Sequence, residues 1–402
     1  MVNVARSELG ERGLDKDRQR LMALYLSSSA LTSRVIAWST YDGYGTERSE
    51  TGEEFEPPYP TGVDALRDGW RLITAAPLQP SEVGTEYSTS FLKFEFWFER
   101  LEPAGDRPRW RGDVGAPASV PAVGSGSLLR TEEMARFVSR GLLVFDRFVP
   151  EELNGPAARE IRGEKGLRQR TSYGARLSDC FAEFPGVRAV LEWPPLLGII
   201  ESMVGPDPVY DHHAVHVRRP GEPSQELHAD SIIDLRAAFD VQLMYYPEEV
   251  GPASGGTLLV PGSHFRRVNE RDIGRYQNVL GQIGLQCSAG TVVVVHHGIW
   301  HCGRRNRTDR ERYMFKLRLA AAVPQVRRWD VSDLGEAGVE TKVQEILAEP
   351  QPWFEDAAGR LEQVQRAALW RHLSGDDAFD AGWRWHDRLA NQRAPRLLDL
   401  LP

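Results

Sequence analysis

The sequence has few cysteines: Cys180, Cys287 and Cys302 are the only three among 402 residues, and they are scattered. We therefore expect no disulfide scaffold, and the scarcity is typical of a protein kept in a reducing cytoplasm. No apolar run approaches the roughly 20 residues that a membrane-crossing helix needs, and the charged beginning of the chain lacks an apolar signal core. We therefore expect a cytoplasmic protein that does not enter a membrane.

Blocks of positive charge are also missing. The chain carries 49 lysines and arginines against 57 aspartates and glutamates, a formal net charge of -8, and no basic cluster stands out. A nucleic-acid-binding surface needs such a cluster, so we expect no nucleic-acid partner. The chain is long enough for a large core with additions, because single domains typically run ~100–200 residues.

Four regions follow one another along the chain. Residues 1–103 predict an N-terminal α+β extension, with helical spacing over Asp15–Trp38 and strand-like runs at Gly69–Leu78 and Ser90–Arg100. Residues 104–130 are rich in Pro, Gly and Ala and predict a linker. Residues 131–325 start with helices and continue with short strands separated by turns, and residues 326–402 predict a helical C-terminal extension.

The strand pattern of residues 131–325 predicts the fold class. Short strands with Gly and Pro between them are typical of a double-stranded β-helix, a relative of the jelly roll, with helices packed outside. The run Thr291–Val295 has no alternation and should be buried on both faces. The C-terminal extension includes an amphipathic pattern over Glu355–Leu373 and several tryptophans, which we expect to cover the barrel exterior or a partner in a homodimer.

The strongest functional signal is the triplet His228-Ala229-Asp230 together with a distant histidine, His301. Residues i and i+2 of a strand point to the same face, so one strand end can present both groups of the triplet to one ion. Two imidazoles and one carboxylate can occupy one face of an octahedral Fe(II) and leave the opposite face open for a co-substrate and dioxygen. We therefore expect the three side chains to be both the metal ligands and the catalytic centre.

An arginine decides which histidine is the distal ligand, because His296 and His297 lie close to His301. Arg312 stands eleven residues after His301, on a strand-like run that returns from a turn, whereas Thr308 stands eleven residues after His297. A planar guanidinium can grip a carboxylate with two parallel hydrogen bonds, and a threonine cannot. His297 is left with two interpretations, a residue lining the site or a core histidine bonded to the backbone.

The segment from about Thr131 to Val323 resembles the phytanoyl-CoA dioxygenase family of Fe(II)/2-oxoglutarate oxygenases. The similarity is carried by ELHAD (residues 226–230), by GGTLLVPGSH (residues 255–264) and most specifically by HCGRRNRTDRER (residues 301–312). In that last run His301, Asn306 and Arg312 fall where the family places its distal histidine, an asparagine and the 2-oxoglutarate arginine. The family often has a hydroxyl residue two positions after the distal histidine, where this chain has Gly303.

The resemblance implies an oxidoreductase that uses Fe(II) and 2-oxoglutarate to hydroxylate or otherwise oxidise a small organic substrate with dioxygen, releasing succinate and CO2. Asp230 favours hydroxylation, because halogenating relatives carry a small residue at this position. Arg312 and Asn306 are the expected co-substrate-binding residues, and we add Gln225 as a pocket-lining candidate. Two alternatives stay open: a catalytically silent binding module, and a metal-dependent cupin-type enzyme that does not use 2-oxoglutarate.

Overall fold

The computed structural model describes residues 18–42, 50–80, 88–102, 128–163, 167, 169–230 and 239–381. The expected linker, residues 104–130, lies almost entirely outside these residues. Among the described helices, none combines the length and the apolar character required to cross a membrane.

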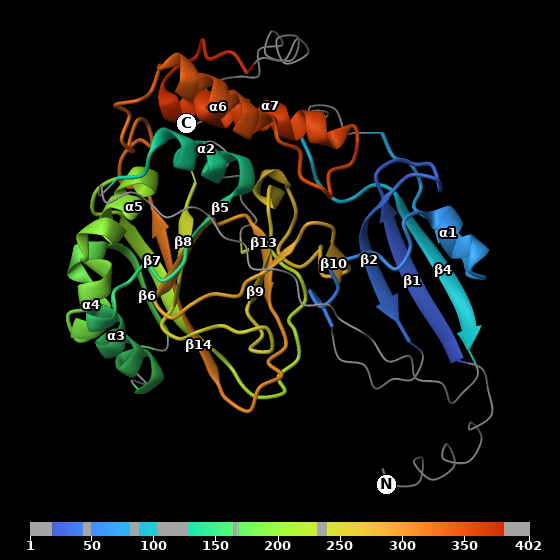
Figure 1. Ribbon diagram of the computed structural model, residues 1–402, viewed down its shortest axis with the longest axis horizontal. Helices are drawn as coiled ribbons and strands as arrows, with labels where there is room; N and C mark the ends of the chain where they lie inside the picture. The colour runs from blue at the N-terminus through green and yellow to red at the C-terminus, as the bar shows by residue number, and fades with distance from the viewer. Residues whose placement is uncertain are drawn as a thin grey trace.

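The centre of the molecule consists of two antiparallel sheets that face each other (Figure 1). The six-stranded sheet has the order β5 (Leu142–Phe145), β12 (Thr291–His296), β8 (Val241–Tyr246), β14 (Arg312–Ala320), β7 (Val209–Arg218) and β6 (Gln169–Arg176). The three-stranded sheet has the order β11 (Ile283–Gly284), β9 (Thr257–Val260) and β13 (Trp300–Gly303). Their inner faces share one apolar cluster, in which Met244 and Val293 of the larger sheet meet Leu259 of the smaller one. This arrangement is the predicted double-stranded β-helix.

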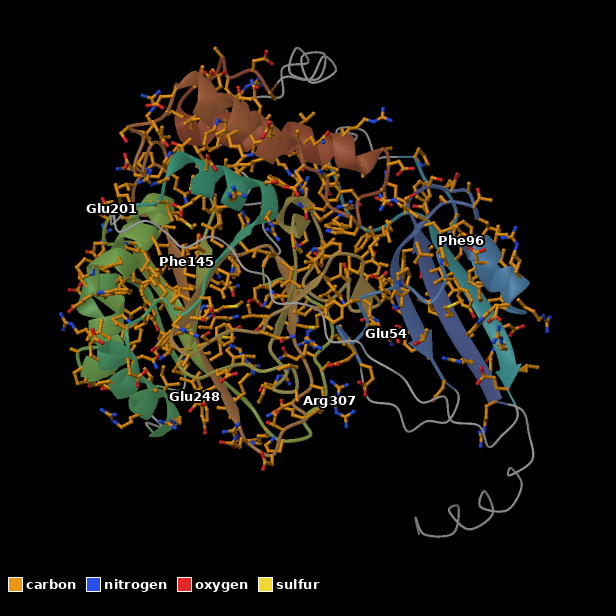
Figure 2. All side chains as sticks on the ribbon, viewed as in Figure 1. Glu54, Phe96, Phe145, Glu201, Glu248 and Arg307 are labelled. Carbon is orange, nitrogen blue, oxygen red and sulfur yellow. The ribbon has the colours of Figure 1, made fainter. Side chains whose placement is uncertain are left out.

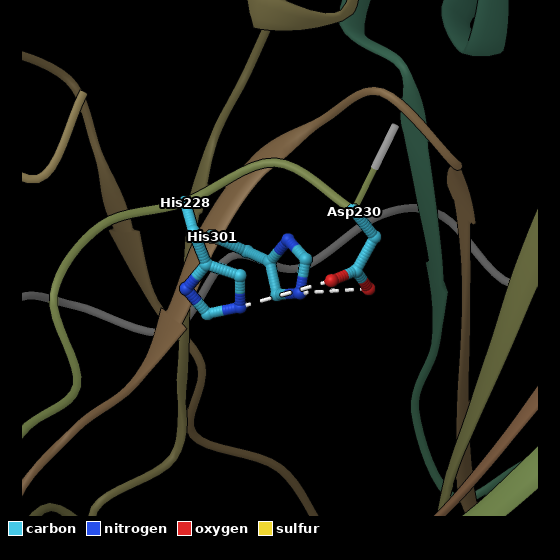
Figure 3. A group of neighbouring side chains, drawn as sticks. All are labelled: His228, Asp230 and His301. Carbon is cyan, nitrogen blue, oxygen red and sulfur yellow. Dashed lines mark ion pairs between the residues drawn. The ribbon is translucent and has the colours of Figure 1, made fainter. Parts of the chain in front are cut away.

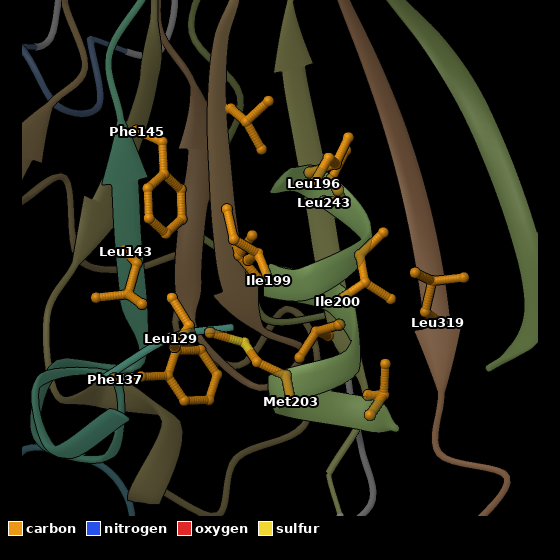
Figure 4. Packing of buried hydrophobic residues seen from close by; sticks show 14 of the residues in the cluster. Leu129, Phe137, Leu143, Phe145, Leu196, Ile199, Ile200, Met203, Leu243 and Leu319 are labelled. Carbon is orange, nitrogen blue, oxygen red and sulfur yellow. The ribbon is translucent and has the colours of Figure 1, made fainter. Parts of the chain in front are cut away.

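Helices cover the outer face of the six-stranded sheet. They are α2 (Thr131–Arg140), α3 (Glu151–Gly163), α4 (Pro185–Leu191) and α5 (Pro194–Val204). Helices α6 (Ala337–Ala348) and α7 (Ala358–Ser374) pack on α2 and on each other. Figure 4 shows α5 pressing Ile199 and Met203 toward Leu143 and Leu243 of the sheet. Because β12 lies between this helical layer and the barrel interior, all six of its residues are buried, as the run of valines predicts. Side chains fill the space between the layers, with Phe145 inside and Glu201 at the periphery (Figure 2).

The N-terminal extension contains a third sheet, and the helix predicted over Asp15–Trp38 is wrong. That segment forms two paired strands, and the sheet has the order β10 (Asn278–Val279), β2 (Val35–Tyr41), β1 (Arg18–Leu26), β4 (Glu95–Glu102) and β3 (Arg71–Ala75). A single short helix, α1 (Gly62–Arg67), accompanies it among the described residues. The central strand β1 buries Ala23 and Tyr25 on one face and Met22 and Leu24 on the other. A strand that is apolar on both faces lacks alternation, and its apolar residues fell by coincidence at helical spacing.

The extension is joined to the barrel by shared structure. Strand β10 comes from the middle of the chain and pairs with β2, and one apolar cluster contains residues of β1, β2, β9 and β13. Trp353, which precedes α7, belongs to this cluster and is fully buried. Its indole Nε1 donates to the Pro261 carbonyl at 2.9 Å, and the Arg266 guanidinium lies 4.8 Å from the ring centroid. Trp353 therefore packs the C-terminal region against the sheet of the extension and against the three-stranded sheet.

Replacing Trp353 with alanine should lower the free energy of unfolding by about 3–5 kcal/mol, the range typical of large aromatic truncations in a core. The loss combines buried apolar area with an indole hydrogen bond. Urea denaturation followed by fluorescence and circular dichroism measures it. Leu78→Ala is the control, because that side chain is 69% exposed and its truncation should change stability by less than ~0.5 kcal/mol. Equal midpoints for the two variants would contradict the anchoring role of Trp353.

Candidate metal centre

His228, Asp230 and His301 come together in one cluster of side chains. His228 and His301 face each other in an isolated antiparallel bridge, in which each backbone N–H donates to the other residue's carbonyl, at 3.0 and 2.8 Å. Residues directly opposite in such a pair send their side chains to the same face. Asp230 follows His228 by two residues and turns toward the two rings (Figure 3). One ligand atom from each of the three residues lies within 4.8 Å of the others.

The two imidazoles are oriented by their own chain. Nδ1 of His228 lies 2.8 Å from the Glu226 carbonyl, and Nδ1 of His301 lies 3.0 Å from the Ile299 carbonyl. A carbonyl only accepts, so Nδ1 carries the proton in each ring and Nε2 presents its lone pair to the centre. This backbone support is the usual companion of a metal-binding histidine. Burial, with a further contribution from His301, lowers the pKa of His228 to about 4, which keeps that ring in the neutral form that binds metals.

The carboxylate of Asp230 is anchored on one oxygen. Lys316 Nζ and Gln242 Nε2 each lie 2.6 Å from Oδ2. His228 Nε2 lies 3.9 Å from Oδ1, and His301 Nε2 lies 3.5 Å from Oδ2. Burial alone would raise the pKa of Asp230, but His301 and Lys316 outweigh it and hold the pKa below its ordinary value. The centre therefore offers two imidazole nitrogens and one anionic oxygen, a donor set that suits a divalent transition metal.

Arg312 is also buried, and part of its guanidinium lacks hydrogen-bond acceptors among the described residues. It is 5% exposed, and its Nε and Nη1 atoms have no hydrogen-bond acceptor among the described residues. Burial lowers the pKa of Arg312, and the nearby Tyr246 partly opposes this effect. The Tyr246 hydroxyl in turn lies 2.7 Å from the Thr257 hydroxyl. A buried guanidinium whose N–H groups lack acceptors, with hydroxyl groups nearby, would stabilise a bound anion.

Arg218 stands opposite Arg312 across β7 and β14, yet its guanidinium is already engaged. It donates to Glu222 and to the Gly303 carbonyl at 2.8 Å, and to the Pro223 carbonyl at 3.2 Å. A Cβ added to Gly303 would come within 2.3 Å of an Arg218 nitrogen. The missing side chain at this position therefore makes room for Arg218. Thr257, which pairs with Gly303 across β9 and β13, carries a hydroxyl on the neighbouring strand.

The other two expected co-substrate residues are Asn306 and Gln225. In the structure their side chains form hydrogen bonds with the backbone of neighbouring segments. The fully buried Asn306 amide donates to the carbonyls of Arg218 and Arg310, at 2.9 and 2.7 Å, and its oxygen accepts from Thr308. It thereby shapes the loop that leads into β14. The Gln225 amide oxygen accepts from the Gly303 N–H at 2.9 Å, and its backbone N–H donates to the Gly303 carbonyl. Contact of either residue with a co-substrate stays a prediction.

The structure places His301, and not His297, in the cluster of potential ligands. His297 is 2% exposed, and its Nδ1 lies 2.7 Å from Gln242 Nε2, so the ring reaches Asp230 through that amide. Sequence reasoning missed Gln242 and Lys316 as partners of Asp230. A signal was present for Lys316, because residues 312, 314 and 316 of one strand share a face and Arg312 was already assigned to the interior. Gln242 gave no comparable signal.

Comparison with known proteins supports this picture over part of the chain. Residues 137–314 match the family model described as phytanoyl-CoA dioxygenase, which confirms the resemblance over the segment that contains all three potential ligands and Arg312. A curated relative, "Dioxygenase af480" of Aspergillus fumigatus, is 27% identical over 128 residues. That match covers 31% of this chain and spans only 41% of the relative's length.

Three solved structures that match part of this chain have low sequence identity to it and low TM-scores. AviO1 from Streptomyces viridochromogenes is 17% identical, with a TM-score of 0.38 over 50% of this chain and 98% of that one. The non-heme alpha-ketoglutarate-dependent carbocyclase SnoK from nogalamycin biosynthesis is 19% identical, with a TM-score of 0.38 over 52% and 88%. EctD from S. alaskensis is 16% identical, with a TM-score of 0.38 over 54% and 83%.

Proposed function

We propose that this chain, whose residues 137–314 match the phytanoyl-CoA dioxygenase family, is an Fe(II)- and 2-oxoglutarate-dependent oxygenase that hydroxylates a small organic substrate. The observation that carries the proposal is the presence, in one barrel, of a donor set of two histidines and one aspartate together with a buried arginine that has idle donors. Within this proposal, residues 131–325 are the oxygenase core. Residues 1–103 and 326–402 are packing additions without chemistry of their own.

His228, Asp230 and His301 would hold the metal through two Nε2 atoms and one carboxylate oxygen. This set fits Fe(II), because both rings are oriented by backbone carbonyls and three ligands on one face leave the opposite positions open. When bound, iron supplies the activation of dioxygen for an oxidation that protein side chains alone cannot perform, with succinate and CO2 formed from the co-substrate. The carboxylate at position 230, in place of a small residue, favours hydroxylation over halogenation.

Arg312 would bind the carboxylate of 2-oxoglutarate that lies away from the metal. Its guanidinium is buried, so an unpaired charge there is unfavourable, and a carboxylate bound beside it would balance the charge and accept from an unbonded N–H group. Tyr246 and Thr257 would contribute a hydroxyl on the same side, in the role for which Gly303 has no side chain. Asn306 would act indirectly, by holding the loop that begins β14.

Arg312→Lys should weaken 2-oxoglutarate binding about ten- to hundredfold, because losing one charge-assisted hydrogen bond costs about 1.5–3 kcal/mol. Lysine keeps the charge but loses the planar two-pronged geometry. Anaerobic titration of 2-oxoglutarate into the Mn(II)-loaded protein measures the dissociation constant. Arg219→Lys serves as the control, since Arg219 is exposed near the end of the opposite strand.

Unchanged affinity in both Arg312→Lys and Arg312→Ala would mean that another residue binds the co-substrate. Arg218 would then be the first candidate, because it lies opposite Arg312 in the pairing of β7 with β14. If Arg219→Lys weakened binding as much as Arg312→Lys, the assignment of one buried clamp would also be wrong.

A further inference from the structure

The two oxygens of Asp230 have different surroundings. Oδ2 accepts from Lys316 Nζ and from Gln242 Nε2, both at 2.6 Å, and lies 3.5 Å from His301 Nε2. Oδ1 lies 3.9 Å from His228 Nε2. We propose that Lys316 and Gln242 are positioning residues that restrict Asp230 to binding the metal through one oxygen. The inference rests on the proposed role of Asp230 as a metal ligand, and it names the parts of the protein that control how this ligand binds.

Both residues rise from the six-stranded sheet beneath Asp230. Lys316 of β14 pairs with Ala214 of β7 on one side and with Met244 of β8 on the other. Gln242 lies two residues before Met244 on β8, so its side chain leaves the sheet on the same face. The small Ala214 side chain leaves space above the sheet beside the lysine stem. The register of β14 against its two neighbours therefore brings an ammonium and an amide to the same carboxylate oxygen.

The ammonium of Lys316 is buried where a lone charge would be unfavourable. Its side chain is 11% exposed, and its ion pair within the described part of the chain is with Asp230. A buried ammonium must be paired, because transfer of an unpaired charge from water into the protein interior is strongly unfavourable. Lys316 therefore needs the Asp230 carboxylate as its ion-pair partner. In any metal-bound state, the ammonium and the metal dication would share that single negative charge.

The orientation of the Gln242 amide follows from its two partners. Its nitrogen lies 2.6 Å from the Asp230 oxygen and 2.7 Å from His297 Nδ1. An ionised carboxylate only accepts hydrogen bonds, so the amide nitrogen, and not the amide oxygen, must face Asp230. The second N–H then reaches His297, which serves as an acceptor through Nδ1. His297 thereby helps to fix Gln242 in the rotamer that captures Oδ2.

Restriction to one oxygen decides how many positions the metal has left. With two imidazoles and one carboxylate oxygen, three of the six octahedral positions stay open. A carboxylate that bound through both oxygens would take a fourth position, leaving too few for a chelating co-substrate and one further small ligand. Lys316 is therefore expected to weaken metal binding, through repulsion and through sharing of the carboxylate, while it preserves the open position that turnover needs.

The test is Co(II) binding to metal-free protein under anaerobic conditions without co-substrate, followed by visible absorption. Lys316→Met should bind Co(II) at least about tenfold more tightly than wild type, because a positive charge beside the dication has been removed. Its Co(II) spectrum should also change, since Oδ2 becomes free to bind. Succinate formation by the Fe(II)-loaded variant should fall despite the tighter metal binding.

Three further variants separate charge from packing. Lys316→Arg keeps the charge and should bind Co(II) within about threefold of wild type. Lys342→Met is the matched control on the exposed surface of α6 and should leave both Co(II) affinity and turnover unchanged. Gln242→Leu removes a neutral hydrogen bond without relieving repulsion, so Co(II) affinity should fall by about tenfold, at the low end for partners that orient a metal ligand.

The inference is overturned if Lys316→Met binds Co(II) no more tightly than wild type. It is also overturned if Lys316→Arg tightens binding as much as Lys316→Met, since packing and not charge would then be responsible. These results are distinct from a failure of the proposed oxygenase function. A wild-type protein that binds Co(II) at this centre but forms no succinate would contradict the oxygenase assignment and leave the affinity comparison valid.

Discussion

His301→Ala is expected to abolish Fe(II)-dependent conversion of 2-oxoglutarate, with a loss well beyond the ~10–100-fold typical of residues that only orient a ligand. The variant removes one of three protein donors, and the neighbouring ring of His297 cannot replace it. His297 Nδ1 is engaged by Gln242, and His297 does not belong to the cluster of potential ligands. Metal content after dialysis and the rate of succinate formation measure the two effects separately.

The matched control is His297→Ala, which truncates a buried histidine from the same stretch of chain. We expect this variant to retain stoichiometric Fe(II), with a reduced rate because Gln242 loses its second partner. If His297→Ala loses iron and His301→Ala retains both iron and turnover, the distal ligand has been assigned to the wrong histidine.

Asp230→Ala should end turnover as completely as the histidine variant, for a different reason. Its carboxylate supplies the single negative charge of the donor set, and it also neutralises the buried Lys316. Removing it leaves an ammonium beside two imidazoles, so a dication would meet only neutral and positive groups. Breaking a buried ion pair by deleting one partner also costs about 3–5 kcal/mol of folding stability, which should appear as a lower melting temperature.

Asp240→Asn is the control for this prediction. Asp240 belongs to the same region, but it pairs with Arg318, which also has Asp211 at 3.2 Å. The variant should therefore keep iron, turnover and most of its stability. Hydroxylated product at the wild-type rate from Asp230→Ala would overturn the proposed donor set.

The clustering of His228, Asp230 and His301 could be predicted from sequence because it depends largely on local rules. The prediction placed His228 and Asp230 on one strand end, whereas the structure has only an isolated bridge at His228, and Asp230 lies outside the strands. The position of Arg312 requires only a turn after His301 and a return strand. The structure confirms the strand β14 from Arg312 onward, and it brings His228 and His301 together in a direct backbone pair. These relations do not depend on how the rest of the chain packs.

The fold of the N-terminal extension was harder to predict from sequence, because its sheet includes a strand from a distant part of the chain. A strand such as β1 is buried on both faces, one toward the barrel and one toward α1, so the alternation that identifies a half-buried strand is absent. The pairing of β10 with β2 joins residues more than two hundred positions apart. No local pattern in either segment predicts that contact.

The hydrogen-bond partners of Asp230 could be predicted from sequence only in part. Lys316 shares a strand face with Arg312, which the period of two indicates, but its contact with Asp230 depends on the register of β14 against β7 and β8. Gln242 depends on that same register and on the position of His297. A register is set by the whole sheet, and one residue of slip would send both side chains to the opposite face.

The most direct test of the proposed oxygenase function is anaerobic loading of the purified protein with Fe(II) and 2-oxoglutarate, followed by exposure to dioxygen and quantification of succinate. We predict succinate formation that requires both Fe(II) and dioxygen, that is lost in His301→Ala, and that needs higher co-substrate concentrations in Arg312→Lys. A wild-type protein that binds Fe(II) at this centre and forms no succinate above the level of His301→Ala would contradict the central claim.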